Sequence, residues 1–205
     1  MYCIDWQAAI LSGPHFIKSY ALTLELSFSL AEIGKMMAQA TPKAVVTFPE
    51  FLPVIKGLQG TPAGSSIKDV ILVGAGQENC HNFSDMSKAD SSSATFLQGS
   101  KIDATQEPAL VLWSSGTTGP AKGVVLTHYS LNSQLEMIIS EHTTQFTLGE
   151  ETGLGLIPFF HVMGAVILCS TALQIGAKIV TLPKFDPQIF TKAAKQHKVR
   201  DSLLE

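Results

Sequence analysis

The alternation of apolar and polar positions divides this chain into short strands and helices that follow one another. Apolar runs rich in β-branched residues predict strands at 44–48, 69–73, 109–113, 124–126, 154–157 and 177–182. Apolar residues at helical spacing predict helices at 31–39, 51–58, 128–139 and 162–173, and one more that begins at 187. Strands that alternate with helices are typical of an α/β fold with parallel sheets and right-handed crossovers.

Local signals predict where several of these helices begin or end. Proline at position 42 ends the first helix, because the residue before a proline avoids helical backbone angles. Thr127 is placed to cap the helix that runs through 139. Asp186 followed by Pro187 predicts a helix start, since the carboxylate accepts unpaired amide hydrogens and proline suits the first helical position.

Residues 84–105 are polar and rich in serine. Such a stretch suits a linker between domains or a surface excursion within one domain. We favour the excursion, because neither side of the stretch has the pattern of a self-sufficient domain.

Residues 152–177 contain no Asp, Glu, Lys or Arg, and their length would permit a membrane span. Against a span, the run holds Pro158, His161, Gln174 and four glycines, and it divides into a short strand, a turn and a helix. Strands of parallel sheets also form continuous apolar runs. We therefore predict a buried core segment and expect no integral membrane span.

Composition and charge exclude several classes of function. Apolar residues make up 45% of the 205 residues and charged residues 15%, which is typical of a globular protein. The net charge is −3 and the lysines are scattered, so we expect no nucleic-acid partner. Cys3, Cys80 and Cys169 form no metal-binding pattern and no disulfide framework. With no signal-peptide pattern at the amino terminus, this usage favours a reducing, intracellular setting.

One glycine-rich loop follows the strand at 109–113 and carries the candidate chemistry. Its residues are Ser114, Ser115, Gly116, Thr117, Thr118, Gly119, Pro120, Ala121, Lys122 and Gly123. The hydroxyls and successive backbone amides can form a nest for anionic oxygens, and the glycines allow the backbone to approach a ligand closely. The lysine adds a cation that counters a polyphosphate. A flexible surface loop would explain the glycines and serines, but not this ordered quartet of hydroxyls closed by a lysine.

Two other phosphate-binding motifs fit the sequence less well. A Walker loop needs glycine before its lysine and a hydroxyl after it, whereas Ala121 precedes Lys122 and Gly123 follows it. The glycines at 74 and 76 suggest a dinucleotide fingerprint, but Asn79 replaces the third glycine and we predict no helix after it. We interpret that segment as a turn at the end of a strand.

Residues 112–127 read Leu-Trp-Ser-Ser-Gly-Thr-Thr-Gly-Pro-Ala-Lys-Gly-Val-Val-Leu-Thr, with His128 after them. This stretch resembles the AMP-binding signature of the adenylate-forming superfamily, which includes acyl-CoA synthetases, 4-coumarate–CoA ligases and beetle luciferases. A second block at 158–164, Pro-Phe-Phe-His-Val-Met-Gly, is similar to the family's next motif in composition and distance. The resemblance covers about 30–199 and is nearest to the 4-coumarate ligase and luciferase branch. It implies an α/β fold with parallel-rich sheets flanked by helices, as part of the family's large domain.

The resemblance also implies a reaction in two steps. ATP and a fatty or aryl carboxylic acid give an acyl-adenylate and pyrophosphate with Mg²⁺ assisting, and coenzyme A then forms a thioester. By similarity, Ser114, Ser115, Gly116, Thr117, Thr118 and Gly119 would hold the β- and γ-phosphates. Lys122 would neutralise those phosphates and His161 would lie beside the reacting carboxylate, which makes both candidate catalytic residues. From its apolar surroundings alone, His161 would instead be a core residue, and we interpret His128 as structural or capping.

The sequence departs from the family at both ends. Residues 1–29 do not resemble it, so we expect a divergent segment there and a partial large domain at 30–205. The family's adenine, ribose and hinge motifs and its small carboxy-terminal domain are not found within these 205 residues. We therefore expect a fragment that is inactive alone, or a truncated isoform that acts as a binding protein. A membrane-associated protein anchored through 152–177 is a third hypothesis. The expected location is cytoplasmic or peroxisomal, although the chain carries no peroxisomal tripeptide.

Overall fold

The computed structural model describes residues 21–22, 29–90, 92, 103–114, 121–141, 147–182 and 185–199. The chain divides into two compact units, one formed by Leu24–Thr95 and the other by Met1–Thr23 together with Phe96–Glu205. One boundary between the units falls within the serine-rich stretch 84–105.

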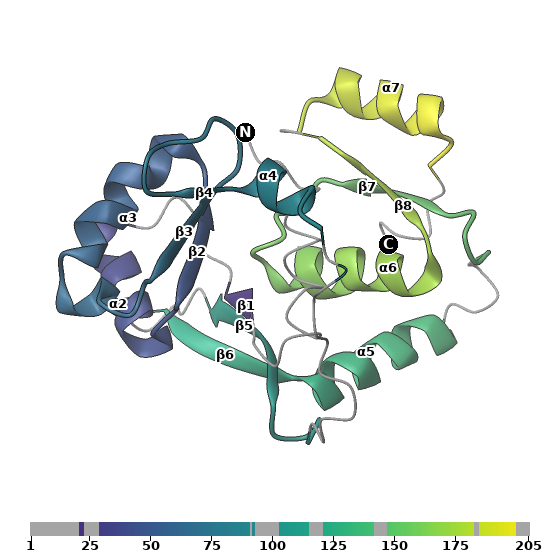
Figure 1. The fold of residues 1–205 in the computed structure, drawn as a ribbon. Coiled ribbons are helices and arrows are strands. Elements are labelled where there is room, and N and C mark those ends of the chain that lie inside the picture. Colours follow the sequence, from purple (N-terminus) through teal and green to yellow (C-terminus); the bar gives the residue numbers. More distant parts are fainter. Residues whose placement is uncertain are drawn as a thin grey trace. The chain divides into compact units, whose positions relative to one another are not determined.

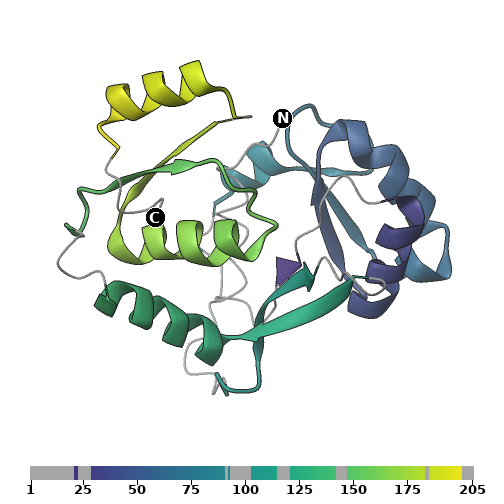
Figure 2. The same ribbon diagram turned by 180° about the vertical axis from the view of Figure 1, so that it is seen from behind.

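In the unit Leu24–Thr95, helices cover one side of a parallel sheet. Its described elements are α2 (Leu30–Ala40), β2 (Ala44–Thr47), η2 (Pro49–Phe51), α3 (Leu52–Gln59), η3 (Pro62–Gly64), β3 (Asp69–Leu72), β4 (His81–Asn82) and α4 (Phe83–Ser87). The strand order is β2-β3-β4, and both pairings are parallel. Helices α2 and α3 lie on the same side of this sheet (Figure 1, and from behind Figure 2). Side chains from both helices and from β3, among them Met37, Leu58 and Leu72, form one apolar core. The helices and strands predicted at 31–39, 44–48, 51–58 and 69–73 are confirmed within one or two residues.

Local hydrogen bonds fix the ends of α2. The Ser29 hydroxyl accepts the backbone N–H of Glu32, and the Glu32 carboxylate accepts the backbone N–H of Ser29 at 2.8 Å. This reciprocal capping box holds the pKa of Glu32 below its usual value, chiefly through the Ser29 side chain. At the other end Thr41 adopts a left-handed conformation with φ 44°, one residue before the proline that was expected to stop the helix.

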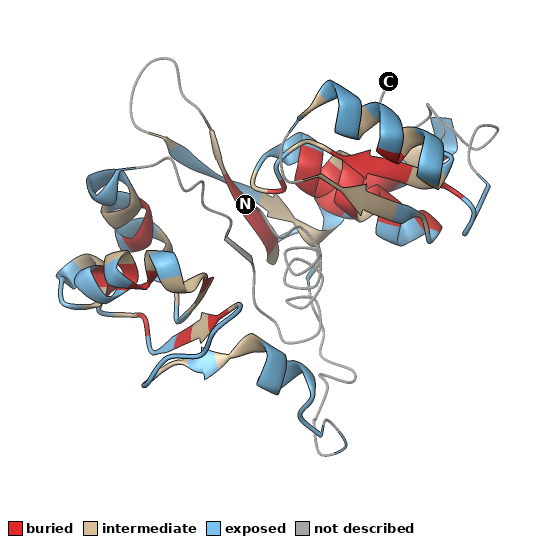
Figure 3. Ribbon diagram, turned by 90° about the horizontal axis from the view of Figure 1, so that it is seen from above, coloured by how far each residue is buried: buried red, intermediate tan, exposed pale blue. Residues whose placement is uncertain are grey.

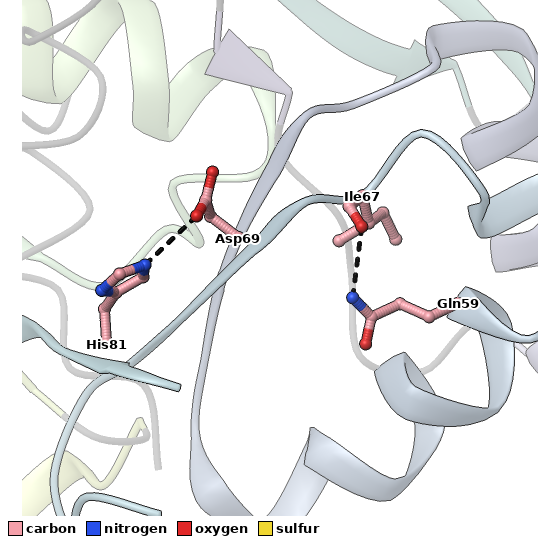
Figure 4. Close-up of polar contacts among 4 residues, drawn as sticks. All are labelled: Gln59, Ile67, Asp69 and His81. Carbon is pink, nitrogen blue, oxygen red and sulfur yellow. Dashed lines mark hydrogen bonds and ion pairs between the residues drawn. The ribbon is translucent and has the colours of Figure 1, made fainter. Parts of the chain in front are cut away.

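No helix follows the glycine turn at 74–76 directly, as predicted, because the next element is the strand β4. Gly74 has φ +112°, and after β4 the chain forms the short helix α4, whose first amides at Ser84 and Asp85 donate to the Asn82 side chain. A five-residue helix is too short to show an apolar period, so only its cap could have revealed it. Polar contacts join neighbouring segments of this unit (Figure 4). His81 Nε2 on β4 lies 3.1 Å from Asp69 Oδ1 on β3. The Gln59 side-chain amide at the end of α3 donates to the Ile67 carbonyl.

The second unit contains mixed rather than wholly parallel strand pairing. Its described elements are β1 (Ala21–Leu22), β5 (Pro108–Ser114), β6 (Lys122–Thr127), α5 (His128–Glu141), β7 (Thr152–Gly155), η4 (Met163–Ser170), α6 (Thr171–Ile175), β8 (Lys178–Thr181) and α7 (Pro187–His197). Strand β5 pairs with β1 in parallel but with β6 antiparallel, and β7 pairs with β8 in parallel. The expectation of parallel strands was wrong for β5 and β6. They are joined by a short loop, whereas a parallel connection needs a crossover of a dozen or more residues.

The apolar run 152–177 forms a strand, a turn and a helix, as predicted. Strand β7 ends at Gly155, two residues earlier than expected, because its pairing with β8 ends there. The helix is not uniform, since η4 is a π-helix that continues into the α-helix α6. Among the described residues, no helix is both long and apolar enough to cross a membrane.

Layers of helices enclose the β7–β8 pair. Helix α7 lies on one side of it, and η4 with α6 lies on the other, followed by α5 (Figures 1 and 2). The Asp186 carboxylate accepts the N–H groups of Gln188 and Ile189, which confirms the predicted start of α7. Buried residues concentrate in η4 and the adjoining strands (Figure 3).

Candidate functional site

The described stem of the β5–β6 hairpin carries both ends of the glycine-rich loop. Ser114 at the end of β5 is paired with Lys122 at the start of β6, and the Lys122 backbone N–H donates to the Ser114 hydroxyl at 3.4 Å. The predicted phosphate-binding residues Ser115, Gly116, Thr117, Thr118 and Gly119 lie outside the described residues. Their roles therefore stay predictions. The structure describes the two strands on either side of the loop, β5 and β6, which we call the hairpin stem.

The Lys122 side chain is exposed. No ion pair involves it among the residues that the structure describes. A cation at the mouth of a hydroxyl-rich loop, without a competing carboxylate, suits the neutralisation of an anionic ligand.

One rung below Ser114 and Lys122, an aromatic side chain packs on a glycine. Trp113 is the cross-strand partner of Gly123, and a Cβ added at Gly123 would lie 3.4 Å from the indole ring and 3.3 Å from Val111. The indole N–H of Trp113 is buried and has no hydrogen-bond partner in the described part of the chain. This packing could not be predicted from the sequence, in which the glycine itself was the available signal. It identifies Gly123 as a site of close approach rather than a loop residue.

The second candidate site is the turn Pro158 to Gly164, which links β7 to η4. Phe159 is 1% exposed and packs with Leu168 and Cys169. The His161 backbone N–H donates to the Pro158 carbonyl at 3.0 Å, and the His161 carbonyl accepts from Ala165 at 2.9 Å. The side chain of His161 is exposed, which argues against the alternative of a buried core residue and leaves its predicted place beside the carboxylate as a prediction.

Gly164 has a structural requirement that the motif alone did not explain. A Cβ at this position would overlap the Pro158 carbonyl and lie 2.9 Å from the Ile157 carbonyl oxygen. The first turn of η4 therefore lies directly against the backbone of the preceding segment, which only glycine permits.

The His161 ring is held by the helix that it precedes. Its Nδ1 atom accepts the backbone N–H of Met163 at 3.2 Å. This bond satisfies an amide at the start of η4 that has no carbonyl partner within the helix.

One apolar core connects the two candidate sites. It contains Ala109, Leu110 and Leu112 of β5, Leu131 and Leu135 of α5, and Ala165 and Val166 of η4. The strand that leads into the loop and the helix that follows His161 are thus packed together. The other helix of this core, α5, begins at His128 and is capped by the Thr127 hydroxyl, which accepts the Ser130 N–H at 3.1 Å.

Other reactive groups in the described residues do not form a second centre. Burial raises the pKa of the Cys169 thiol to about 11, which keeps it protonated and unreactive. No cluster of three or more His, Cys, Asp or Glu side chains able to hold a metal ion occurs in the described ranges.

Comparison with known proteins places this geometry in one family. The model of the AMP-binding enzyme family matches residues 6–202. The chain belongs to the AMP-binding enzyme family.

The relatives agree with this assignment. The chain is 31% identical to 4-coumarate–CoA ligase 5 of Oryza sativa subsp. japonica over 171 residues, which are 82% of this chain and 30% of that protein. It is 30% identical to a long-chain-fatty-acid–CoA ligase of Bacillus subtilis over 180 residues, which are 88% of this chain and 31% of that one. The fold also matches a red-emitting luciferase of Phrixothrix hirtus with a TM-score of 0.77 at 22% identity, covering 97% of this chain and 38% of the luciferase.

The chain spans about a third of the length of the curated relatives that it matches. The predicted class, α/β with parallel strands as part of the large domain of an adenylate-forming enzyme, is confirmed. The CoA ligases among the relatives also confirm the resemblance to the acyl-CoA and 4-coumarate ligase branch.

Proposed function

We propose that the β5–β6 hairpin and the turn Pro158 to Gly164 belong to the site of an ATP-dependent carboxylate–CoA ligase. One observation carries this proposal. Lys122, at the end of the glycine-rich loop, and His161 are both exposed, and the elements next to them pack into one apolar core. We further propose that residues 30–205 form part of the large domain and that residues 1–29 form a divergent amino-terminal segment.

In the proposed first step, a carboxylate oxygen attacks the α-phosphorus of ATP and the bond to the β-phosphate breaks. An acyl-adenylate forms and pyrophosphate leaves. Lys122 and the hydroxyl and amide donors of residues 114–119 would stabilise the charge on the leaving phosphates, which is the main demand of such a displacement. We propose that Mg²⁺ binds to the phosphates of ATP, because Mg²⁺ is usually held by substrate phosphates together with one or two carboxylates.

In the proposed second step, the coenzyme A sulfur attacks the acyl carbon and AMP leaves. The acid is proposed to be an aryl-propenoic or a fatty acid, because the similar ligases are named for 4-coumarate and for long-chain fatty acids.

The binding part of this proposal is tested by equilibrium binding of Mg-ATP to the 205-residue chain. Replacing Lys122 with Ala is expected to weaken binding about ten- to a hundredfold, since a charge-assisted hydrogen bond contributes roughly 1.5–3 kcal/mol. Lys178→Ala is the matched control, because Lys178 is also exposed and also begins a strand of the same unit. Equal effects of the two substitutions, or no ATP binding by the wild-type chain, would contradict the proposed site.

A non-catalytic binding protein is the second candidate. It differs from a ligase in an activity that can be measured, and we predict that the 205-residue chain alone supports no carboxylate-dependent pyrophosphate exchange. Exchange well above that of the Lys122→Ala variant would overturn that prediction. An immunoblot of the source cells separates the candidates: a band of several hundred residues indicates a complete ligase, and one near 22.0 kDa favours the binding protein.

A further inference from the structure

We propose that the turn Pro158 to Gly164 holds His161 as a neutral imidazole with its proton on Nε2, and that Gly164 is the positioning residue that makes this arrangement possible. The use of that proton in acid activation rests on the proposed function, but the arrangement itself does not.

The protonation site follows from the partner of the ring. A backbone N–H can only donate, so the Met163 N–H requires a lone pair on Nδ1 of His161, which lies 3.2 Å away. A neutral imidazole with a lone pair on Nδ1 carries its hydrogen on Nε2. The contact therefore selects one of the two neutral forms of the ring.

The position of the Met163 N–H depends on Gly164. The first turn of η4 lies against the carbonyls of Ile157 and Pro158, with no room for a Cβ at position 164. The buried Phe159 ring packs against Leu168 and Cys169 of η4 and so holds the same segment against the helix. A side chain at 164 would force the helix start away from residues 157–158, and the Met163 N–H would move with it.

The chemical consequence concerns the role of His161 in the proposed reaction. Because the side chain is exposed, its Nε2–H is open to a ligand. A neutral ring fixed in this form donates a hydrogen bond to an anionic oxygen of a carboxylate or acyl phosphate, and the proton remains on Nε2. With Nδ1 occupied, the ring has no free lone pair to accept a proton, so His161 is a donor and not a general base.

The arrangement can be tested without any ligand, by nitrogen NMR of the histidine-labelled 205-residue chain at about pH 8, above the usual imidazole pKa. The signals of His161 are assigned by their loss in His161→Asn. We expect the widely separated pair of nitrogen shifts that marks a single Nε2–H form. The opposite pattern, or averaged shifts typical of a mixture, would overturn the proposal.

The role of Gly164 is tested by the same spectrum of Gly164→Ala. We expect the two His161 shifts to move toward the average of the two forms. A folded Gly164→Ala protein with unchanged His161 shifts would show that Gly164 is not the positioning residue.

If Gly164→Ala does not fold, a pair of substitutions at His161 itself keeps the inference testable. Asn places its amide oxygen near the position of Nδ1 and can still accept from Met163, whereas Gln places its amide nearer the position of Nε2. We expect His161→Asn to keep the wild-type melting temperature and His161→Gln to lower it. Equal melting temperatures would contradict the inferred bond, while leaving the ATP-binding proposal to its own test.

Discussion

The hairpin stem and the histidine turn carry the two candidate sites, yet they are built in opposite ways. The stem is a ladder of backbone hydrogen bonds with Lys122 at its mouth, and both faces of β6 are open, since the consecutive Val124 and Val125 are 46% and 53% exposed. The turn has local hydrogen bonds at His161 rather than a ladder. Its shape is fixed by a buried ring at Phe159 and by backbone contact at Gly164.

This difference matches the chemistry proposed for each part. A polyphosphate is long and highly charged, so the exposed cation of Lys122 and the hydroxyls near it in the sequence can contact several of its oxygens. A single hydrogen bond to a reacting oxygen depends on placement to within a fraction of an ångström. The more closely packed of the two regions is the one that holds the histidine.

The largest expected effect is a difference in unfolding free energy between a buried side chain of the turn and an exposed side chain of the hairpin. Phe159→Ala should lower the free energy of unfolding by about 3–5 kcal/mol, because it opens a cavity beside Leu168 and Cys169. Val125→Ala on the hairpin should change it by less than about 0.5 kcal/mol, because that side chain is half exposed. Urea unfolding monitored by circular dichroism measures both, and a comparable loss for Val125→Ala would contradict the contrast.

The two glycines provide a second and smaller test. Gly164→Ala should cost roughly 1–3 kcal/mol, because the added carbon meets backbone carbonyls that cannot move alone. Gly123→Ala should cost less than about 1 kcal/mol, because its neighbours are the side chains of Val111 and Trp113, which can shift slightly. Gly57→Ala, on an exposed helical site with nothing within 4 Å, is a control expected to stabilise the protein by about 0.5–1 kcal/mol. Equal losses at 164 and 123 would show that the turn is no more constrained than the stem.

A third test concerns the cap that follows the hairpin. Thr127→Ala should cost about 1 kcal/mol, because it removes the hydroxyl that accepts the Ser130 N–H at the start of α5. Thr127→Ser keeps that hydroxyl and should recover most of the loss in thermal unfolding. A serine variant as unstable as the alanine variant would point to lost packing of the methyl group instead.

The smallest expected effect is a loss of stability at acid pH. We expect it for the turn before β5, which leads into the hairpin, and not for the histidine turn. Hydrogen bonds from the Thr105 hydroxyl and N–H hold the pKa of Asp103, in the turn before β5, below its usual value of 3.8. A lowered folded-state pKa contributes stability above the unfolded pKa, and this contribution is lost as pH falls through the folded value. The difference in stability between wild type and Thr105→Val should therefore be constant at neutral pH and shrink below about pH 4.

The histidine turn contains no carboxylate, so it serves as the control region for this pH test. The loss caused by Phe159→Ala should stay the same over the acid range in which the Thr105→Val difference shrinks. If both differences change in parallel, Asp103 is not the source of the effect.

Much of the fold was predictable because its signals are local. The caps at Thr127 and Asp186, the proline after α2 and the apolar strand at 109–113 each act over a few residues, and all are found as expected. The direction of β6 was not predictable from apolar alternation, which is the same for parallel and antiparallel neighbours. The short connection was the available signal.

The candidate site was only partly predictable for the same reason. The motifs predicted Lys122 and His161 as site residues. The apolar periodicity could not show that His161 is exposed or that its ring accepts a hydrogen bond from the Met163 N–H. Those properties depend on the close approach of Gly164 to residues 157–158, which are near in sequence but whose contact is set by the turn. The assigned roles of the loop residues at 115–119 stay predictions.

The π-helix η4 has a consequence for how relatives should be aligned and how the chain can be edited. Its hydrogen bonds reach one residue further along the chain than those of an α-helix, and hydroxyls at Ser170 and Thr171 reach back by the same five-residue step. Removing one residue between Met163 and Ser170 would shorten this five-residue step toward the four-residue step of an α-helix. The narrower turn would take up the lost residue, so the segments on either side could keep their faces. A one-residue gap at this place in an alignment therefore indicates a change in helix type, with the histidine motif still in place.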